Sequence, residues 1–337
     1  MNEQNNPSDL NNLDSSKKLT RRDFLKYSTE MIIGGVLLTS CMNNSQNQDK
    51  NKYLPNPNKI IDTTTTVPET TTTMIEYDPA LTEWTYDFAN IPNGPLPTDF
   101  WNFDIGTKVA NYNNEAQAYT NNLKNIRVED GILIIEAIKE NYDGKHFTSA
   151  RINTFKKFSF LYGTLETDMI LPQGIGTWPA AWLLPRYDIY NPKNYNVNQH
   201  NKFIYTFNGE IDFMETIGRL VNENYPAAHT YASLNSPGEG IPILKSVPDA
   251  YTKFHKYGVI KTPDLISFTL DGEVYATVKK NGNSPINWPF DQPYYLIINL
   301  ALGGNWAGGD PRFPPYGIDE SKAPWQLKTR SIHYTPL

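Results

Sequence analysis

Residues 265–278 read Leu-Ile-Ser-Phe-Thr-Leu-Asp-Gly-Glu-Val-Tyr-Ala-Thr-Val. Two runs rich in β-branched and aromatic residues flank an Asp-Gly pair. This dipeptide is favoured in two-residue hairpin turns because both turn positions need a positive φ. The stretch therefore predicts a strand over 265–270, a tight turn at Asp271 and Gly272, and an antiparallel strand over 273–278.

The strand pattern continues on both sides of this hairpin. Residues 131–138 and 294–301 are rich in β-branched or aromatic types, and 158–170 alternates with a period near two. Turn residues separate these runs, and we find neither a long stretch of helical periodicity nor an internal repeat. Many short strands of this kind predict an all-β sandwich, which we place within a domain spanning residues 79–337.

The composition limits the class of partner. The 337 residues carry a net charge of −6, and such a surface repels phosphate backbones, which argues against nucleic acid. Aromatic residues make up 13% of the chain, a share that serves both core packing and stacking on flat ligands. Cys41 is the single cysteine, so no disulfide forms within the chain.

The first 41 residues resemble a bacterial export signal. Thr20-Arg-Arg-Asp-Phe-Leu-Lys26 is similar to the twin-arginine pattern. The apolar run 31–38 is far shorter than the roughly 20 residues that span a bilayer, and fits a signal peptide instead. Leu38-Thr-Ser-Cys41 resembles a lipobox, which implies acyl chains on Cys41. We expect an exported protein held to a membrane by lipidated Cys41; a basic arm before a short buried helix is the alternative.

The segment from 42 to 78 has a different composition from the rest of the chain. Asn, Gln, Pro and Thr dominate it, with runs of Thr at 63–66 and 70–73. It has too little apolar content to bury a core and is predicted to be a disordered linker. A linker there would hold the following domain away from a membrane surface.

Three acidic residues lie close together in the segment Asn208-Gly-Glu-Ile-Asp-Phe-Met-Glu-Thr216. Residues two apart on a strand share a face, so Glu210 and Asp212 point the same way. Strict alternation would send Glu215 to the opposite face, but one extra residue in a β-bulge returns it to the first. The apolar residues between the acids suit the buried side.

Three carboxylates on one face suggest acid–base chemistry. Close like charges do not all ionise, so one carboxyl keeps its proton. A protonated acid beside an ionised carboxylate is the pair that hydrolyses glycosides. A solvated acidic strand edge or a calcium site is the alternative for this segment taken alone.

Further segments accompany the acids in a fixed order. They are Asn125-Ile-Arg-Val-Glu-Asp-Gly-Ile-Leu-Ile-Ile-Glu136, Thr148-Ser-Ala-Arg-Ile152, Gly176-Thr-Trp-Pro-Ala-Ala-Trp-Leu-Leu-Pro185, Trp288-Pro-Phe-Asp-Gln-Pro293 and Asn299-Leu-Ala-Leu-Gly-Gly-Asn-Trp306. Together with the Glu-x-Asp-x-x-Glu signature they resemble the laminarinase-like branch of glycoside hydrolase family 16, over about residues 84–310.

The resemblance implies a jelly-roll sandwich with a substrate cleft across its concave sheet. By position, Glu210 is the nucleophile and Glu215 the acid/base. Asp212 orients the nucleophile and tunes its proton affinity. The family's chemistry retains the anomeric configuration, which goes with carboxyl groups about 5–5.5 Å apart.

Matching motifs also suggest substrate-binding residues. Trp178 and Trp182 correspond to tryptophans that stack on sugar rings, with core packing as the alternative. Arg151, Asn305 and Trp306 bind sugar hydroxyls or support the scaffold; the sequence leaves both open.

This chain departs from the family pattern after the acids. Many relatives carry a His in a Thr-x-His segment, and here Asn235 takes that place, so we expect Asn235 beside the substrate. His229 and His255 are expected to be structural, because neither has metal-ligand spacing to a second His or Cys. The Tyr- and Asn-rich insertion 186–207 forms either a cleft wall or a passive loop. The C-terminal run 326–334 lacks the aspartate that holds calcium in relatives, so we expect no metal and no cofactor.

These observations predict a monomeric endo-glycosidase acting on β-1,3- or mixed β-1,3-1,4-glucan. The acids do not separate it from a relative that cuts a galactan or from a transglycosylase, because loops set that difference. A non-catalytic carbohydrate-binding jelly roll is a third class, which retention of all three carboxylates disfavours.

Overall fold

The structure is a computed structural model that describes residues 82–337 apart from 198–203, 221, 236–242 and 309–316. The predicted signal 1–41, the lipidation site Cys41 and the linker 42–78 lie outside the described residues. No helix in the described ranges is both long enough and apolar enough to cross a membrane.

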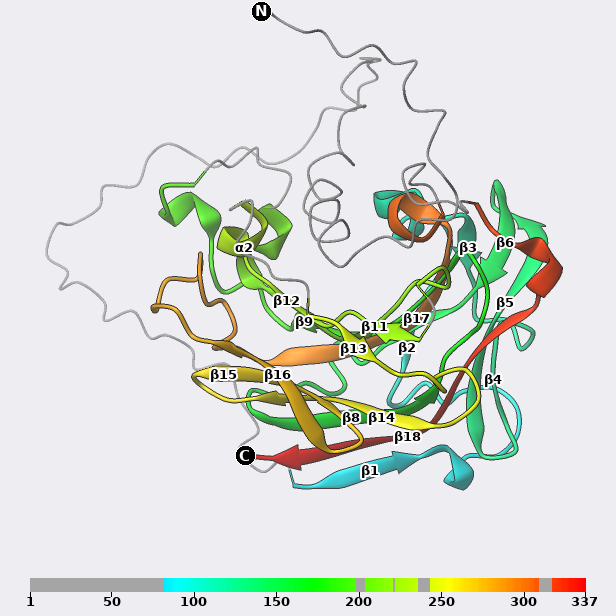
Figure 1. Ribbon diagram of the computed structural model, residues 1–337, viewed down its shortest axis with the longest axis horizontal. Coiled ribbons are helices and arrows are strands. Elements are labelled where there is room, and N and C mark those ends of the chain that lie inside the picture. Colours follow the sequence, from blue (N-terminus) through cyan, green and yellow to red (C-terminus); the bar gives the residue numbers. More distant parts are fainter. Residues whose placement is uncertain (1–81, 198–203, 221, 236–242, 309–316) are drawn as a thin grey trace, which may run out of the picture.

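Two stacked sheets form the body of the domain (Figure 1). The smaller sheet has the order β12 (Ala227–His229), β10 (Glu210–Glu215), β9 (Thr177–Pro185), β17 (Tyr294–Leu302), β7 (Arg151–Asn153) and β2 (Asn102–Asp104). Its neighbouring strands are antiparallel throughout. This sheet carries the acidic segment in β10, next to its β12 edge.

The larger sheet backs the smaller one. Its order is β16 (Glu273–Lys279), β15 (Leu265–Leu270), β14 (His255–Lys261), β8 (Gly163–Ile170), β18 (Trp325–Pro336), β5 (Ile132–Tyr142), β6 (Lys145–Ser149) and β3 (Gln117–Tyr119), with β1 (Trp84–Asp87) on β18 and β4 (Ile126–Glu129) on β5. A short pair, β11 (Glu223–Asn224) and β13 (Lys245–Ser246), stands apart from both sheets. The predicted all-β sandwich is confirmed.

The predicted hairpin is present with the predicted turn. Leu270 pairs with Glu273, and the two residues between them, Asp271 and Gly272, have φ of 53° and 82°. Both angles are positive, as a two-residue turn of this kind requires.

The strand predicted over 158–170 is shorter than expected. It begins only at Gly163, whose φ is 136° and which lies against the backbone of Thr335. Before it, Phe160 makes a single bridge to Tyr294 in the other sheet. The chain therefore crosses between sheets where the alternating pattern suggested one continuous strand.

The hydrophobic core fills the space between the sheets. From β10 it receives Ile211, Phe213 and Met214, which face residues such as Tyr257 and Val259 of β14 within one buried cluster. Burying apolar area stabilises the sandwich by about 25 cal/mol per Å². Because the core takes the apolar residues of β10, its acids are left on the outer face of the smaller sheet.

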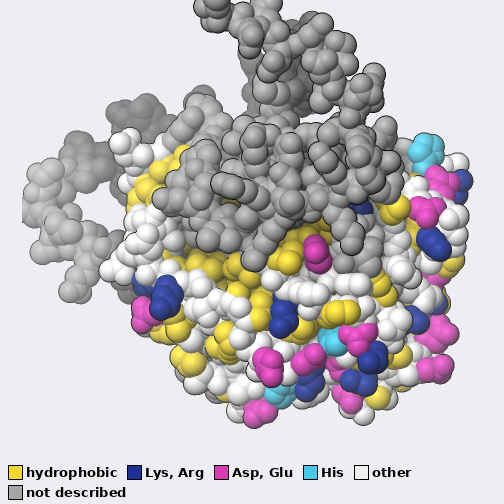
Figure 2. All heavy atoms as spheres, viewed as in Figure 1, with side chains coloured by type: hydrophobic (Ala, Val, Ile, Leu, Met, Phe, Trp, Pro, Cys, Tyr) yellow, Lys and Arg dark blue, Asp and Glu magenta, His cyan; other side chains and the backbone are white. Residues whose placement is uncertain are grey.

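Charges of both signs are interspersed on the surface. In the view of Figure 2, acidic, basic and His side chains alternate along the lower part of the face, where Figure 1 shows β8, β14 and β18. Mixed charge of this kind fits the mildly acidic composition.

Candidate active site

A β-bulge in β10 brings the three acids together. Ile211 and Asp212 pair with Leu183 and Trp182, but Met214 pairs with Ala181, so Phe213 is the extra residue. After the shift Glu215 lies opposite Ala180, on the same face as Asp212 opposite Trp182. The structure thus contains the bulge that the sequence predicted, and Glu210, Asp212 and Glu215 share one face.

Trp178 fixes the Glu215 side chain. Its indole Nε1 donates a 2.8 Å hydrogen bond to Glu215 Oε1. Trp178 is half-buried on β9, on the same face as the acids. A rigid indole donor orients one carboxylate oxygen and leaves the other free to meet a ligand.

Asp212 is buried and contacts His229. The His229 Nε2 lies 3.2 Å from Asp212 Oδ2, and His229 pairs with Glu210 across β10 and β12. His229, which was expected to be structural, thus lies against the acid row, a contact that the expectation did not include. Sequence reasoning missed it because the contact depends on the pairing of β12 with β10.

Glu210, Asp212 and His229 are also the residues that could hold a metal among those the structure describes. Their ligand atoms lie within 4.8 Å of one another. Two carboxylates and an imidazole suit a zinc-like ion. The same groups serve equally as a proton-sharing row.

Burial raises the pKa of each of the three carboxyls to about 8. The Asp212 carboxyl adds to the rise at Glu210 and Glu215. His229 lowers the pKa of both glutamic acids, and the Trp178 hydrogen bond lowers that of Glu215. Groups this close do not all ionise, so the row keeps a proton at neutral pH.

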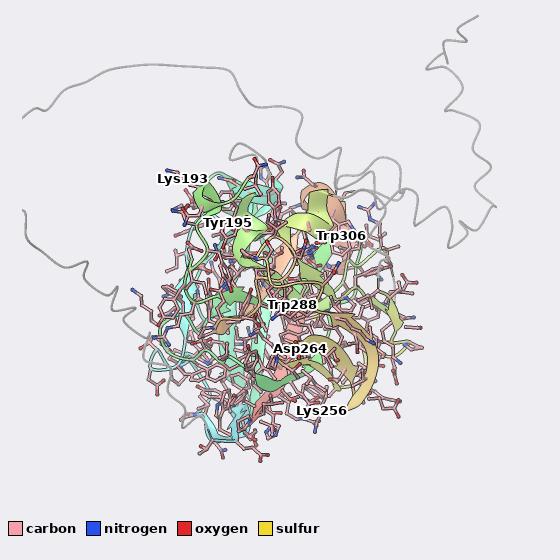
Figure 3. All side chains as sticks on the ribbon, turned by 90° about the vertical axis from the view of Figure 1, so that its left-hand side faces the viewer. Lys193, Tyr195, Lys256, Asp264, Trp288 and Trp306 are labelled. Carbon is pink, nitrogen blue, oxygen red and sulfur yellow. The ribbon has the colours of Figure 1, made fainter. Side chains whose placement is uncertain are left out.

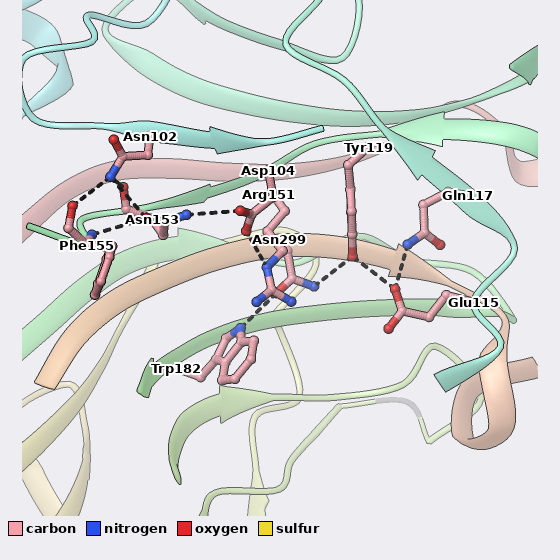
Figure 4. A network of polar contacts seen from close by, with 10 residues as sticks. All are labelled: Asn102, Asp104, Glu115, Gln117, Tyr119, Arg151, Asn153, Phe155, Trp182 and Asn299. Carbon is pink, nitrogen blue, oxygen red and sulfur yellow. Dashed lines mark hydrogen bonds and ion pairs between the residues drawn. The ribbon is translucent and has the colours of Figure 1, made fainter. Parts of the chain in front are cut away.

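A polar row crosses the sheet away from the acids (Figure 4). The Trp182 Nε1 donates to Asn299 Oδ1 at 2.8 Å. The Arg151 guanidinium lies 4.8 Å from the Trp182 ring centroid, and its Nε donates to Asp104 Oδ2 at 2.8 Å. Trp182 and Arg151 therefore lie on the face that carries the acids.

The row continues to a buried carboxyl that sequence reasoning missed. Glu115 Oε2 accepts hydrogen bonds from Gln117 Nε2 at 2.7 Å and from the Tyr119 hydroxyl at 3.1 Å (Figure 4). Asn299 Nδ2 in turn lies 3.4 Å from that hydroxyl. Burial raises the pKa of Glu115. Its signal was the spacing of polar groups at every second position from Glu115 to Tyr119.

Trp306 and Asn305 lie in the helical turn Gly304–Gly308. The Trp306 ring meets Trp178 edge to face, with centroids 5.4 Å apart, and so joins the acid site. Asn305 is exposed, and its Oδ1 accepts a 2.9 Å hydrogen bond from Asn114 Nδ2. Trp306 therefore contacts the acid site through Trp178, whereas the hydrogen bond of Asn305 is made with Asn114 and not with a residue of the acid site.

The insertion 186–207 is fastened to the start of the catalytic strand. The Asn208 side chain accepts a hydrogen bond from the Tyr190 backbone nitrogen at 3.0 Å and donates one to its carbonyl at 3.1 Å. Figure 3 shows Tyr195 of the insertion at the same end of the domain as Trp306. This position favours a wall of the site over a passive loop.

Asn235 ends the short helix α2 (Tyr231–Asn235), which follows β12. Its side chain is outside the described set, so its expected place beside the substrate stays a prediction. His255 lies away from the acid row on β14, between Asp249 and Asp271 at 2.9 and 2.8 Å.

Comparison with known proteins identifies the family. A β-glucanase of Rhodothermus marinus is 35% identical over 72% of this chain and 79% of its own length. A glucan endo-1,3-β-glucosidase of Cryptopygus antarcticus is 34% identical over 74% of this chain and 90% of its own. The crystal structure of the Rhodothermus marinus laminarinase superimposes with a TM-score of 0.65 at 35% identity, covering 75% of this chain and 96% of that one.

The fold is the jelly-roll sandwich of these glycoside hydrolases, as the resemblance implied. The model of the glycosyl hydrolases family 16 matches residues 108–315, a span that contains the acid row, both tryptophans of β9 and the turn with Trp306. This chain therefore belongs to the glycosyl hydrolases family 16.

Proposed function

We propose that the protein is a retaining endo-glycosidase that hydrolyses β-1,3- or mixed β-1,3-1,4-glucan. The observation that carries this proposal is the bulge in β10, which gathers Glu210, Asp212 and Glu215 on one face. The relatives named as glucanases support the substrate class.

In the first step Glu210 attacks the anomeric carbon of the sugar. Glu215, protonated, gives its proton to the leaving glycosidic oxygen, so a glycosyl-enzyme forms and the chain breaks. Glu215, now ionised, then takes a proton from water, and that water releases the sugar from Glu210. Asp212, held by His229, keeps a proton within the row and stabilises the charge that moves between the two glutamates.

In this proposal the polar row forms the surface of the sheet on which the glucan chain binds. The acids on β10 and the polar row on β9, β17, β7 and β2 together span five strands about 4.8 Å apart, far enough for several sugar units. Trp182 offers an aromatic face, and Arg151 and Asn299 offer hydrogen bonds to hydroxyls. This arrangement suits an extended chain that continues on both sides of the cut, as endo cleavage requires.

An NMR time course on laminarin tests the stereochemistry. A first-formed product of β configuration is expected, and an α product would rule out the assignment of Glu210 and Glu215. The Glu210→Gln and Glu215→Gln variants should each nearly abolish hydrolysis. Because the two groups act as a unit, the double variant should be little worse than either.

A reducing-sugar screen on laminarin, lichenan, agarose, carrageenan and xyloglucan tests the substrate class. Activity confined to laminarin and lichenan is expected. Activity on agarose or carrageenan alone would assign a galactan instead. Transfer products at high oligosaccharide concentration would indicate a transglycosylase, and binding without cleavage a carbohydrate-binding protein.

We also propose that residues 1–41 direct export, that Cys41 carries a lipid anchor, and that residues 42–78 tether a monomeric domain. The order of arginine pair, apolar run and lipobox supports this proposal. Replacing Arg21 and Arg22 by Lys should leave precursor in the cytoplasm. Detergent partitioning that does not change on Cys41→Ala would refute the anchor, and a dimer by light scattering would refute the monomer.

A further inference from the structure

The bulge in β10 places unusual demands on the backbone beside it. The edge strand β12 pairs with β10 only opposite Glu210–Asp212. Beyond Asp212 the neighbour on this side is the segment after β11, where the Tyr225 nitrogen donates to the Glu215 carbonyl at 2.8 Å. Between these two contacts lie the carbonyl of Phe213 and the amide of Glu215, which need partners because buried backbone groups are costly to leave unpaired.

One side chain satisfies both groups. Asn224 Oδ1 accepts from the Glu215 backbone nitrogen at 2.9 Å, and its Nδ2 donates to the Phe213 carbonyl at 3.1 Å. A side-chain amide carries one acceptor and one donor group, as a peptide does. Asn224, which is 1% exposed, therefore takes the place of a paired strand residue beyond the end of the β12 pairing.

The second hydrogen of this amide fixes its orientation. Asn224 Nδ2 also donates to the Tyr275 hydroxyl of β16, at 3.1 Å. Burial raises the pKa of Tyr275, so its hydroxyl stays protonated. If the Asn224 amide turned over, its NH₂ would face the Glu215 N–H and its oxygen would face the Phe213 carbonyl. Both pairs would repel each other, so only one orientation is stable.

We propose that Asn224 is a positioning residue for the acid/base Glu215, and that its amide holds the bulge that turns Glu215 onto the face of Glu210. The proposal rests on the catalytic roles given above. Trp178 orients the Glu215 carboxylate, whereas Asn224 sets the backbone from which that carboxylate projects. Without this amide, β10 would lose the bulge and return to regular strand pairing. A shift of one residue in the pairing turns a side chain to the other face of a sheet, so Glu215 would leave the face of Glu210.

The test compares Asn224→Leu with a matched control, Asn125→Leu. Asn125 is also a fully buried amide that bridges three partners, donating to the Glu136 carbonyl and the Thr148 hydroxyl at 3.0 Å each and accepting from the Thr120 hydroxyl at 2.6 Å. It lies on the other sheet, next to β4 and β5. Both variants should lose thermal stability, but only Asn224→Leu should lose the general acid catalysis by Glu215.

Substrates with different leaving groups separate the two effects. On laminarin, Asn224→Leu should lower kcat roughly 100- to 1,000-fold with KM nearly unchanged, within the range that a misplaced general acid costs. On a 2,4-dinitrophenyl β-oligoglucoside, whose leaving group needs no proton, formation of the glycosyl-enzyme should be spared, so the loss in kcat/KM should stay below about tenfold while release of the glycosyl-enzyme limits kcat. Azide, which attacks the glycosyl-enzyme and displaces the Glu210 carboxylate without base assistance, should speed turnover and give a β-glycosyl azide.

The same assays on Glu215→Gln keep the two proposals apart. If that variant lacks this dependence on the leaving group, the assignment of Glu215 is wrong. If it has the dependence while Asn224→Leu turns over laminarin like Asn125→Leu, the role of Asn224 is refuted. Should Asn224→Leu not fold, Asn224→Asp decides by the same criteria, since it keeps the acceptor for the Glu215 amide and loses the donor to Phe213.

Discussion

Replacing Glu215 by Gln removes an ionisable carboxyl whose charged form is disfavoured by burial, so the substitution should change how the stability of the protein depends on pH. Burial raises the pKa of Glu215 from the usual 4.5 to about 8, with the Asp212 carboxyl adding to the rise. Gln keeps the shape of the side chain and its Oε1, so the hydrogen bond from Trp178 is preserved. The substitution therefore changes charge and leaves packing intact.

The sign of the effect follows from proton linkage. In the unfolded chain Glu215 loses its proton near pH 4.5, whereas in the folded protein it holds it to about pH 8. Between these values the folded state binds more protons, so the free energy of unfolding falls as pH rises. Gln carries no such proton, and the variant should lose this part of the pH dependence.

The magnitude can be bounded from the structure. Each pKa unit is worth about 1.36 kcal/mol, so the difference between 4.5 and about 8 sets a ceiling of about 5 kcal/mol above pH 8. Glu215 is only half-buried and shares its proton with Asp212, which reduces the expected gain to about 2 kcal/mol. For a domain of this size that corresponds to a Tm higher by roughly 3–10 °C.

Urea unfolding at pH 5, 6.5 and 8 measures the effect. Glu215→Gln should be close to the unsubstituted protein at pH 5 and most stabilised at pH 8. Glu273→Gln, at an exposed carboxyl on β16, is the control and should change stability little at any pH. A stabilisation by Glu215→Gln that is no larger at pH 8 than at pH 5 would refute the reasoning.

Three further predictions concern the site and its support. Gly209 has φ of 83°, and a Cβ there would collide with the Tyr294 hydroxyl. Gly209→Ala should therefore cost about 2–4 kcal/mol and most of the activity; unchanged urea midpoint and turnover would contradict this. Burial lowers the pKa of Lys261 from the usual 10.5 to about 7, so its charge costs stability in full below pH 7 and progressively less up to about pH 10.5. Lys261→Met should be more stable than the unsubstituted protein at pH 6 by about 1–2 kcal/mol, and this gain should shrink as pH rises from about 7 towards 10.5, where the unfolded Lys also loses its proton; a gain that grows with pH would be evidence against it. Zn²⁺ should inhibit reversibly at the cluster of Glu210, Asp212 and His229, and His229→Asn should weaken this inhibition about tenfold or more; equal inhibition of both proteins would exclude the cluster.

Local patterns were sufficient where neighbours in sequence are neighbours in space. The Asp-Gly pair needs only its own two positive φ angles, so the hairpin 265–278 was predictable. The acids of β10 alternate with residues that suit a core, and this contrast predicted both their shared face and the bulge. The alternating run 158–170 misled because Phe160 bridges to the other sheet and the strand begins only at Gly163.

The sequence by itself determined the all-β class and the acid row, because both rest on side-chain periodicity along single strands, whereas Trp178 and Trp182 of β9 were identified from the family resemblance. Only the tertiary structure decided which contacts hold the acid row and its neighbouring polar residues in place. His229 reaches Asp212 across two paired strands, Arg151 meets Asp104 from 47 positions away, and the Asn224 amide closes the bulge. These contacts depend on strand register, which is set when both sheets bury their apolar faces together and which no local pattern encodes.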